Sequence, residues 1–334
     1  MTLVDSGSRP VAGPFFEDLA VGDVFDEAPA LTLTEGHAAV HQAVVGDRLR
    51  IALDGRLSHA VARAPIAHPA LVCDVAIGQS TLATQRVVAN LFYRGLVLRR
   101  APAIGDTLYT RTEIVALRRN RSRPTGLAVL RVRTTDQVDR TVLDFWRCAM
   151  LPVGDPEAAT GADDDLEAIP AGLPEAPELA AAVAGWDLGA FRRIVPGAHL
   201  DALEPGMRWV VEGGDVVSAA PELARLSLNL ATVHHDAGAT GTGRRLVYGG
   251  HTIGIACSHV TRALPNLAYV VAWRGCDHLG PVLEGDVLRS VVTLDGVEPL
   301  AGGGGLVELR CEVAAHRDGE AHDVLDWRLV GVMA

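Results

Sequence analysis

The chain has 334 residues, a formal net charge of −11 and 49% hydrophobic residues, of which few are aromatic. This length suits two domains with aliphatic cores. The acidic balance lacks a basic stripe for phosphates, which excludes nucleic acid as an expected partner. No apolar run is long enough to cross a bilayer, and five scattered cysteines without CxxC spacing indicate reduced thiols. We therefore expect a cytoplasmic protein with no membrane contact and no bound metal.

The first half begins with helical patterns and continues as strands. Thr34 is a candidate N-cap of a helix that Gly46-Asp47 ends, and a polar connection leads to a second apolar run from Pro65 to about Leu82. Alternating segments then predict four antiparallel strands, at 87–97, 107–117, 126–135 and 141–151. A stretch rich in proline, alanine and acidic groups, 154–181, predicts a linker.

The second half has the same plan. Helices are predicted at 221–233 and 250–264, and strands at 268–275, 286–295, 305–314 and 322–332. An offset of about 180 residues aligns RGLVLRRAPAIGDTL with RGCDHLGPVLEGDVL without a gap, which indicates a tandem duplication. We place the first domain at 1–152, the linker at 153–190 and the second domain at 191–334.

The stretch 226–254, LSLNLATVHHDAGATGTGRRLVYGGHTIG, carries the densest set of polar groups. Asn229, His234 and Asp236 come first, a glycine-rich turn follows, and an apolar run opens with a second set: Arg244, Arg245, Tyr248, Gly249, Gly250 and His251. An imidazole beside a Gly-Gly helix start places a general base near unpaired backbone N–H donors. Such donors stabilise a forming oxyanion.

These motifs resemble the MaoC-like family of (R)-specific enoyl-CoA hydratases, whose signature is a GDxNPxHxD loop followed by a PIxHG turn. The first half supplies Gly46-Asp47 and the turn PIAHP at 65–69, and the second supplies HHD at 234–236 and LVYG at 246–249. The resemblance implies an α+β tandem double hot-dog, in which a curved antiparallel sheet wraps a long central helix in each of two copies.

Within that family, several phrases are most similar to mesaconyl-CoA hydratases (β-methylmalyl-CoA dehydratases): TLTEGHAAVHQAVVGDR, RRLVYGGHT, TRALPNLAYVVAW and CDHLGPVLEGDVLRS. The resemblance implies reversible hydration of a short, branched or carboxylated enoyl-CoA. It implies no cofactor, because the substrate itself carries CoA, and it allows a homodimer.

Family members pair an Asp with a His five residues later, and neither half keeps both. Ala52 follows Asp47 at that spacing, and Asn229 precedes His234. Pro69 also replaces the glycine of the first turn, which removes a backbone donor. We therefore expect the active site in the second half, with Asp47 and His68 as a remnant that does not meet His234.

In the favoured site we expect His234 to exchange protons with water and the α-carbon, while the amide oxygen of Asn229 holds the water. Asp236 completes the candidate catalytic set. Gly249 and Gly250 would form the oxyanion hole. The substrate contacts are expected from Arg244 or Arg245, which suit a carboxylate, and from Tyr248 and His251.

Two other functions remain open. The incomplete Asp/His pair is compatible with a degenerate protein that binds an acyl thioester without turnover, and hot-dog proteins also include thioesterases. The adjacent pair Asp277-His278 is a further candidate for lining the site, although the first copy has Val97-Leu98 at that position.

Overall fold

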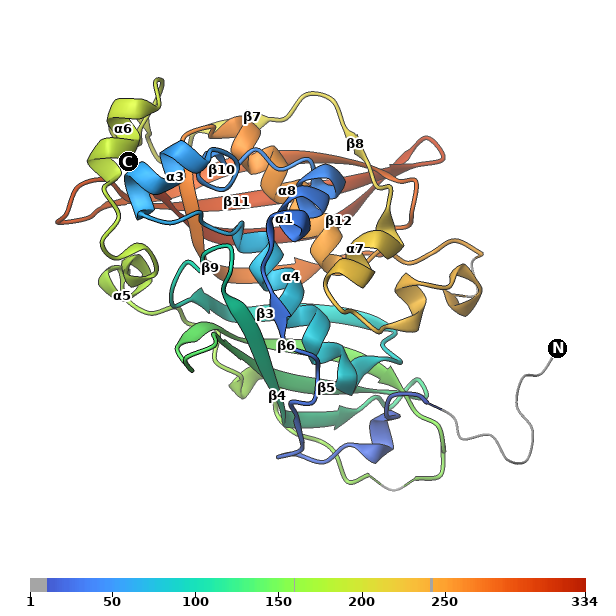
Figure 1. Ribbon diagram of the computed structural model, residues 1–334. Helices are drawn as coiled ribbons and strands as arrows, with labels where there is room; N and C mark the ends of the chain where they lie inside the picture. The colour runs from blue at the N-terminus through green and yellow to red at the C-terminus, as the bar shows by residue number, and fades with distance from the viewer. Residues whose placement is uncertain (1–10, 159, 241–242) are drawn as a thin grey trace.

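One antiparallel sheet runs through both halves of the chain (Figure 1). The computed structural model describes residues 11–158, 160–240 and 243–334; residues 241 and 242 of the predicted glycine-rich turn lie outside them. The strands are β1 (Val24–Phe25), β2 (Leu31–Thr32), β3 (Ala89–Leu98), β4 (Thr107–Arg119), β5 (Thr125–Thr135), β6 (Thr141–Pro152), β7 (Arg208–Val210), β8 (Asp215–Val216), β9 (Leu267–His278), β10 (Val287–Pro299), β11 (Gly305–Arg317) and β12 (Glu320–Met333). Their main order is β1-β4-β5-β6-β3-β9-β12-β11-β10-β7, so the β3–β9 pair joins the two halves.

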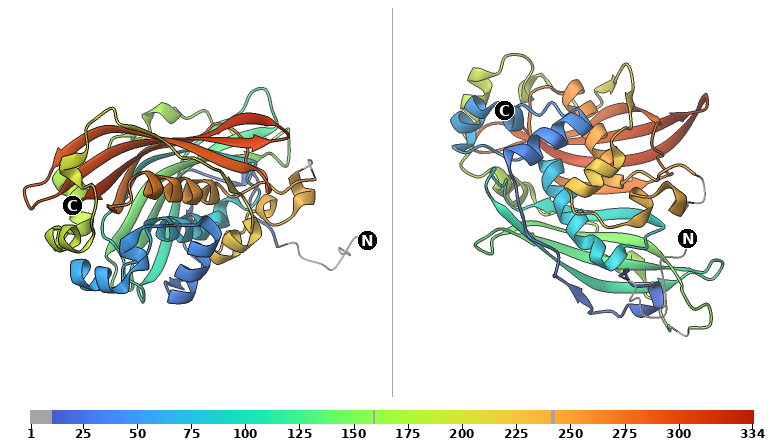
Figure 2. Two further views of the ribbon diagram at one scale, coloured as in Figure 1. Left: turned by 90° about the horizontal axis from the view of Figure 1, so that it is seen from above. Right: turned by 45° about the vertical axis from the view of Figure 1, so that its right-hand side comes forward.

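The sheet curves over two central helices, one from each half, as the view from above in Figure 2 shows. The helices are α1 (Glu35–Val45), α2 (Arg50–Leu53), α3 (Gly55–Ala62), α4 (Pro69–Gln79), α5 (Ala176–Ala180), α6 (Leu188–Ile194), α7 (Ala220–Leu226) and α8 (Gly249–Ala263). Every residue of α4 and most of α8 are buried. The predicted α+β class, with two helices wrapped by antiparallel strands, is confirmed.

Capping side chains and backbone angles explain where the predicted helices begin and end. Thr34 caps α1 by accepting the N–H of His37, and Gly46 ends it with a φ of 68°. The polar connection expected after it is wrong, because α2 and α3 form there and Asp54 caps α3. The helix predicted at 221–233 stops at Leu226, since Leu228 has a φ of 60° that a helix cannot accommodate.

The stretch expected as a linker also contains helices. α5 forms within it, α6 begins at its end, and Leu179 of α5 is buried against the core. Because burial of an apolar side chain favours the folded state, this segment is packed onto the protein.

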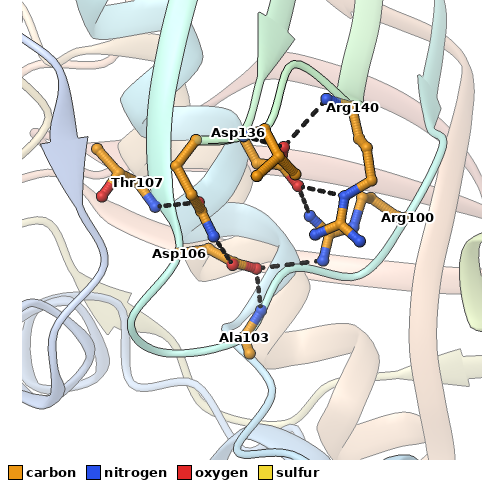
Figure 3. A network of polar contacts seen from close by, with 8 residues as sticks. Arg100, Ala103, Asp106, Thr107, Asp136 and Arg140 are labelled. Carbon is orange, nitrogen blue, oxygen red and sulfur yellow. Dashed lines mark hydrogen bonds and ion pairs between the residues drawn. The ribbon is translucent and has the colours of Figure 1, made fainter.

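Equivalent turns in the two halves support the duplication. Asp106 accepts the N–H of Ala103 at 2.9 Å, and Asp286 accepts the N–H of Leu283 at 2.8 Å. Figure 3 shows the first turn, where Arg100 links Asp106 to the carboxylate of Asp136. Equivalent aspartates therefore close equivalent turns in the two copies.

Each half also forms hydrogen bonds that fix a loop segment of the other half in place. Ser258 of α8 donates to the carbonyl of Gly46 at 2.7 Å, and the N–H of Leu230 donates to Thr81 at 2.9 Å. A Cβ on Gly78 of α4 would lie 1.7 Å from the carbonyl oxygen of Ser227. The segment that leads to His234 is thus positioned by the central helix of the first half.

Among the described residues, no helix is long and apolar enough to cross a membrane.

Candidate active site

A cavity of about 390 Å³ lies between the two halves. The first half contributes the 3₁₀ helix that follows α4 and parts of β3 and β6. The second half contributes the segment before His234, the start of α8 and the end of β9. The lining residues are Thr81, Thr84, Val87, Val88, Ala89, Asn90, Tyr93, Arg147, Asn229, Ala231, His234, Leu246, Val247, Tyr248, Gly249, Thr252, His278, Leu279, Gly280, Pro281 and Val282. Four candidates of the stretch 226–254 therefore meet in one place, together with His278.

His234 is held as a neutral imidazole. Its Nδ1 lies 3.0 Å from the carbonyl oxygen of Leu246, and because a carbonyl only accepts, Nδ1 carries the proton. The lone pair is then on Nε2. Burial lowers the pKa of His234 to about 4, so the ring is uncharged at neutral pH. An uncharged imidazole at the cavity wall can accept a proton from a bound water.

Asn229 uses its amide oxygen within the protein. This oxygen accepts the N–H of Ala231 at 2.9 Å, and the backbone carbonyl of Asn229 contacts Nε2 of His235 at 2.6 Å. The amide NH₂ group is the part of the side chain left to donate. The expected contact between the amide oxygen and a water stays a prediction.

The start of α8 brings backbone N–H groups to the cavity. Gly249 lines it, and the first N–H groups of a helix have no partner within the helix. Both glycines are also required by packing. A Cβ on Gly249 would lie 2.8 Å from the ring of His278, and one on Gly250 would lie 2.1 Å from Asp74. Tyr248, also in the lining, has its ring centroid 5.8 Å from that of His234, with the two rings tilted to each other.

Of the alternative pair at the end of β9, His278 lines the cavity while Asp277 is exposed. Burial lowers the pKa of His278 to about 4, and its Nε2 has no hydrogen-bond partner within the described part of the chain. Its ring meets Tyr93 edge-on, with the centroids 5.9 Å apart. His278 is therefore a second neutral imidazole at the site.

The other candidates of the same stretch lie outside the lining residues. Arg244 pairs with Asp286 at 3.2 Å, and Arg245 pairs with Glu284. Asp236 is exposed and closes a turn by accepting the N–H of Gly238 at 2.8 Å. His251 is fully buried within α8, where burial lowers its pKa to about 4. None of the four is among the lining residues, and the catalytic and substrate contacts expected of them stay predictions.

No family model matches the chain, but proteins similar over its whole length are known. A conserved hypothetical protein from Mycobacterium tuberculosis with a double hotdog fold is 52% identical, covers 96% of this chain and 99% of its own, and superposes with a TM-score of 0.88. The beta-methylmalyl-CoA dehydratase of Chloroflexus aurantiacus is 27% identical over 93% of this chain and 90% of its own. The mesaconyl-CoA hydratase of Cereibacter sphaeroides is 28% identical over 91% of this chain and 90% of its own.

The chain belongs to the MaoC-like double hot-dog family. A MaoC domain protein from Chloroflexus aurantiacus, 23% identical, shares the fold with a TM-score of 0.86 over 98% of this chain and 99% of its own. The predicted family and fold are confirmed, and both relatives of named activity are a dehydratase or a hydratase, as expected.

In this double hot-dog protein the first-half remnant forms a closed pair. Oδ1 of Asp47 lies 2.8 Å from Nε2 of His68, and Nδ1 of His68 accepts the N–H of Ala70 at 3.1 Å. Burial by itself raises the pKa of Asp47, but His68 and the N–H of Leu49 outweigh it and lower the pKa below its usual value. Neither Asp47 nor His68 is among the lining residues.

The thiol of Cys257 lies close to this pair, and the three donor atoms are all within 4.8 Å of one another. A metal would need the Nε2 lone pair of His68. Because Nδ1 already accepts a backbone N–H, the ring proton is on Nε2, which lies 2.8 Å from Oδ1 of Asp47. The donor chemistry therefore argues against a metal at these three residues.

The cavity also contains Arg147, which sequence reasoning missed. It lies on β6 with 4% of its surface exposed, and its guanidinium donates to Thr84. The available signal was an arginine within the apolar run LDFWRCAML, at a position where the strand alternation predicts an inward-facing side chain. Its meeting with His234 depends on the pairing of the two halves, which one sequence does not show.

Proposed function

We propose that this MaoC-like double hot-dog enzyme reversibly adds water to a short enoyl-CoA thioester in the cavity between its halves. The hydratase and dehydratase named among its relatives support this class of reaction. Within the structure, the proposal rests on one observation: the neutral His234 lines the same cavity as Gly249 at the start of α8, where the first N–H groups have no partner within the helix.

The proposed hydration proceeds from these groups. Nε2 of His234 takes a proton from water as the water oxygen bonds to the β-carbon, and the amide NH₂ of Asn229 orients that water. Electrons of the double bond move to the thioester oxygen, which the N–H groups of Gly249 and Gly250 stabilise with the helix dipole. The protonated His234 then gives its proton to the α-carbon. Dehydration follows the same path in reverse.

With Asn229 in place of the family's aspartate, a single imidazole performs both proton transfers. The fixed tautomer makes this possible, because the Leu246 carbonyl stabilises the imidazolium that forms between the two steps. The departure from the family pattern thus removes a charge without removing the base.

The test is to mix the purified protein with mesaconyl-CoA and with crotonyl-CoA and follow two signals. We expect the enoyl absorbance to fall with no release of free thiol. Thiol release would instead assign a thioesterase. Tight binding of both thioesters with neither signal would overturn the proposal in favour of a binding protein.

A further inference from the structure

Arg147 is a buried cation whose recorded partners are neutral. Its guanidinium donates to the hydroxyl of Thr84, and Tyr93 faces it on the neighbouring strand. Its Nε has no hydrogen-bond partner, and no ion pair with a carboxylate joins it, within the described part of the chain. A guanidinium out of water without an anion is costly, which points to an anion missing from its surroundings.

The second half shows that the fold does not require this charge. Equivalent ion pairs, Arg131 with Asp144 and Arg310 with Asp326, align β5–β6 with β11–β12. In that alignment, the pair of Tyr93 with Arg147 corresponds to the pair of Trp273 with Leu329.

Trp273 and Leu329 are both buried. One copy thus fills this place with apolar side chains, while the copy facing the cavity keeps a polar pair. Because the charged side chain occurs only in the copy that lines the cavity at this position, it indicates that the cavity binds a ligand of opposite charge.

We propose that Arg147 binds a carboxylate at the far end of the acyl chain, so that the enzyme selects thioesters of dicarboxylic acids. The thioester part of this inference rests on the proposed function. A guanidinium presents parallel N–H donors that match a carboxylate. Because Arg147 is almost completely buried, it suits the enclosed acyl end of the ligand rather than the phosphates of CoA, which stay hydrated.

Arg147 also replaces the arginines expected for this contact. Arg244 and Arg245 already pair with carboxylates of the turn around Glu284 and lie outside the lining. The substrate carboxylate would otherwise have to displace an existing acidic partner.

The test compares binding of succinyl-CoA and butyryl-CoA, which have equal chain length and differ in the terminal carboxylate. Neither has a double bond, so the readout does not require turnover and remains informative if hydration fails. Calorimetry should show that the wild type binds succinyl-CoA roughly 10- to 100-fold more tightly, as a hydrogen-bonded charge pair implies.

Arg147→Leu places the residue type of the second copy at this position, and Arg147→Gln provides a second, polar variant. Both should fold and lose the preference through weaker succinyl-CoA binding, with butyryl-CoA binding kept within about threefold. Arg131→Leu, on the neighbouring strand and paired with Asp144, is the matched control and should keep the preference. A preference that survives in both Arg147 variants would overturn the inference. Equal weakening of both ligands would also overturn it and assign Arg147 to the CoA phosphates.

Discussion

The proton transfer proposed for His234 depends on two features of its surroundings. The carbonyl of Leu246 holds the proton on Nδ1, and burial keeps the ring neutral. A general base must be unprotonated to act, so a pKa lowered to about 4 keeps the active form present at more acidic pH than an ordinary histidine allows.

The pH dependence of kcat/KM for hydration should therefore be flat from pH 8 to about pH 5.5 and decline only below that, because kcat/KM reports the ionisation of the free enzyme. Stopped assays with folding monitored at each pH measure this directly. An acidic limb with an apparent pKa near the usual histidine value of about 6.5 would contradict the assigned state of His234.

How far the sequence predicts the site depends on distance along the chain. Asn229, His234, Tyr248 and Gly249 belong to one local motif, and they meet in the cavity. Arg147 comes from the other half, so no local pattern connects it to the motif. Arg244 and Arg245 stand within the motif, yet acidic groups of the turn at Glu284 and Asp286 bind them.

At the scale of elements, the approach to the site depends on close contact between α4 and the segment before Asn229. Gly78 permits this contact because a Cβ would lie 1.7 Å from a backbone carbonyl oxygen, which has no side-chain freedom to move aside. The central helix of the first half therefore supports the segment of the second half that leads to His234.

Gly78→Ala should destabilise the protein by about 3 kcal/mol or more and reduce hydration in the remaining folded fraction, because the Ser227 backbone must shift. The matched control is Gly55→Ala on α3, where an added Cβ would meet nothing within 4 Å. The open space and the better helix propensity of alanine should make that change close to neutral. Denaturant unfolding of both variants compares them, and equal losses would contradict the role given to Gly78.

Strands were the most predictable elements, because the long strands alternate between a buried and a more exposed face. The short helices α2, α3 and α7 were not predictable in extent, since their ends depend on tertiary contacts and on a single residue, Leu228, with positive φ.

At the scale of the whole molecule, duplication has produced two different halves. The second half supplies His234 and the start of α8 to the cavity, and the first half supplies Arg147 and Tyr93. The equivalent place in the other half is filled by Trp273, which packs edge-on against Trp327 at 5.6 Å. At this position one copy lines the cavity, and the other has become core.

The rate of mesaconyl-CoA hydration by two single variants tests this division most directly. Asp47→Asn keeps an acceptor for the N–H of Leu49 and for His68, whereas His234→Gln removes the base. Because general acid–base catalysis contributes roughly 100- to 10,000-fold, we expect kcat to fall by that factor in His234→Gln and by less than about threefold in Asp47→Asn. A large loss in Asp47→Asn with activity kept in His234→Gln, both variants being folded, would place the reaction in the first half and contradict the site described for the second.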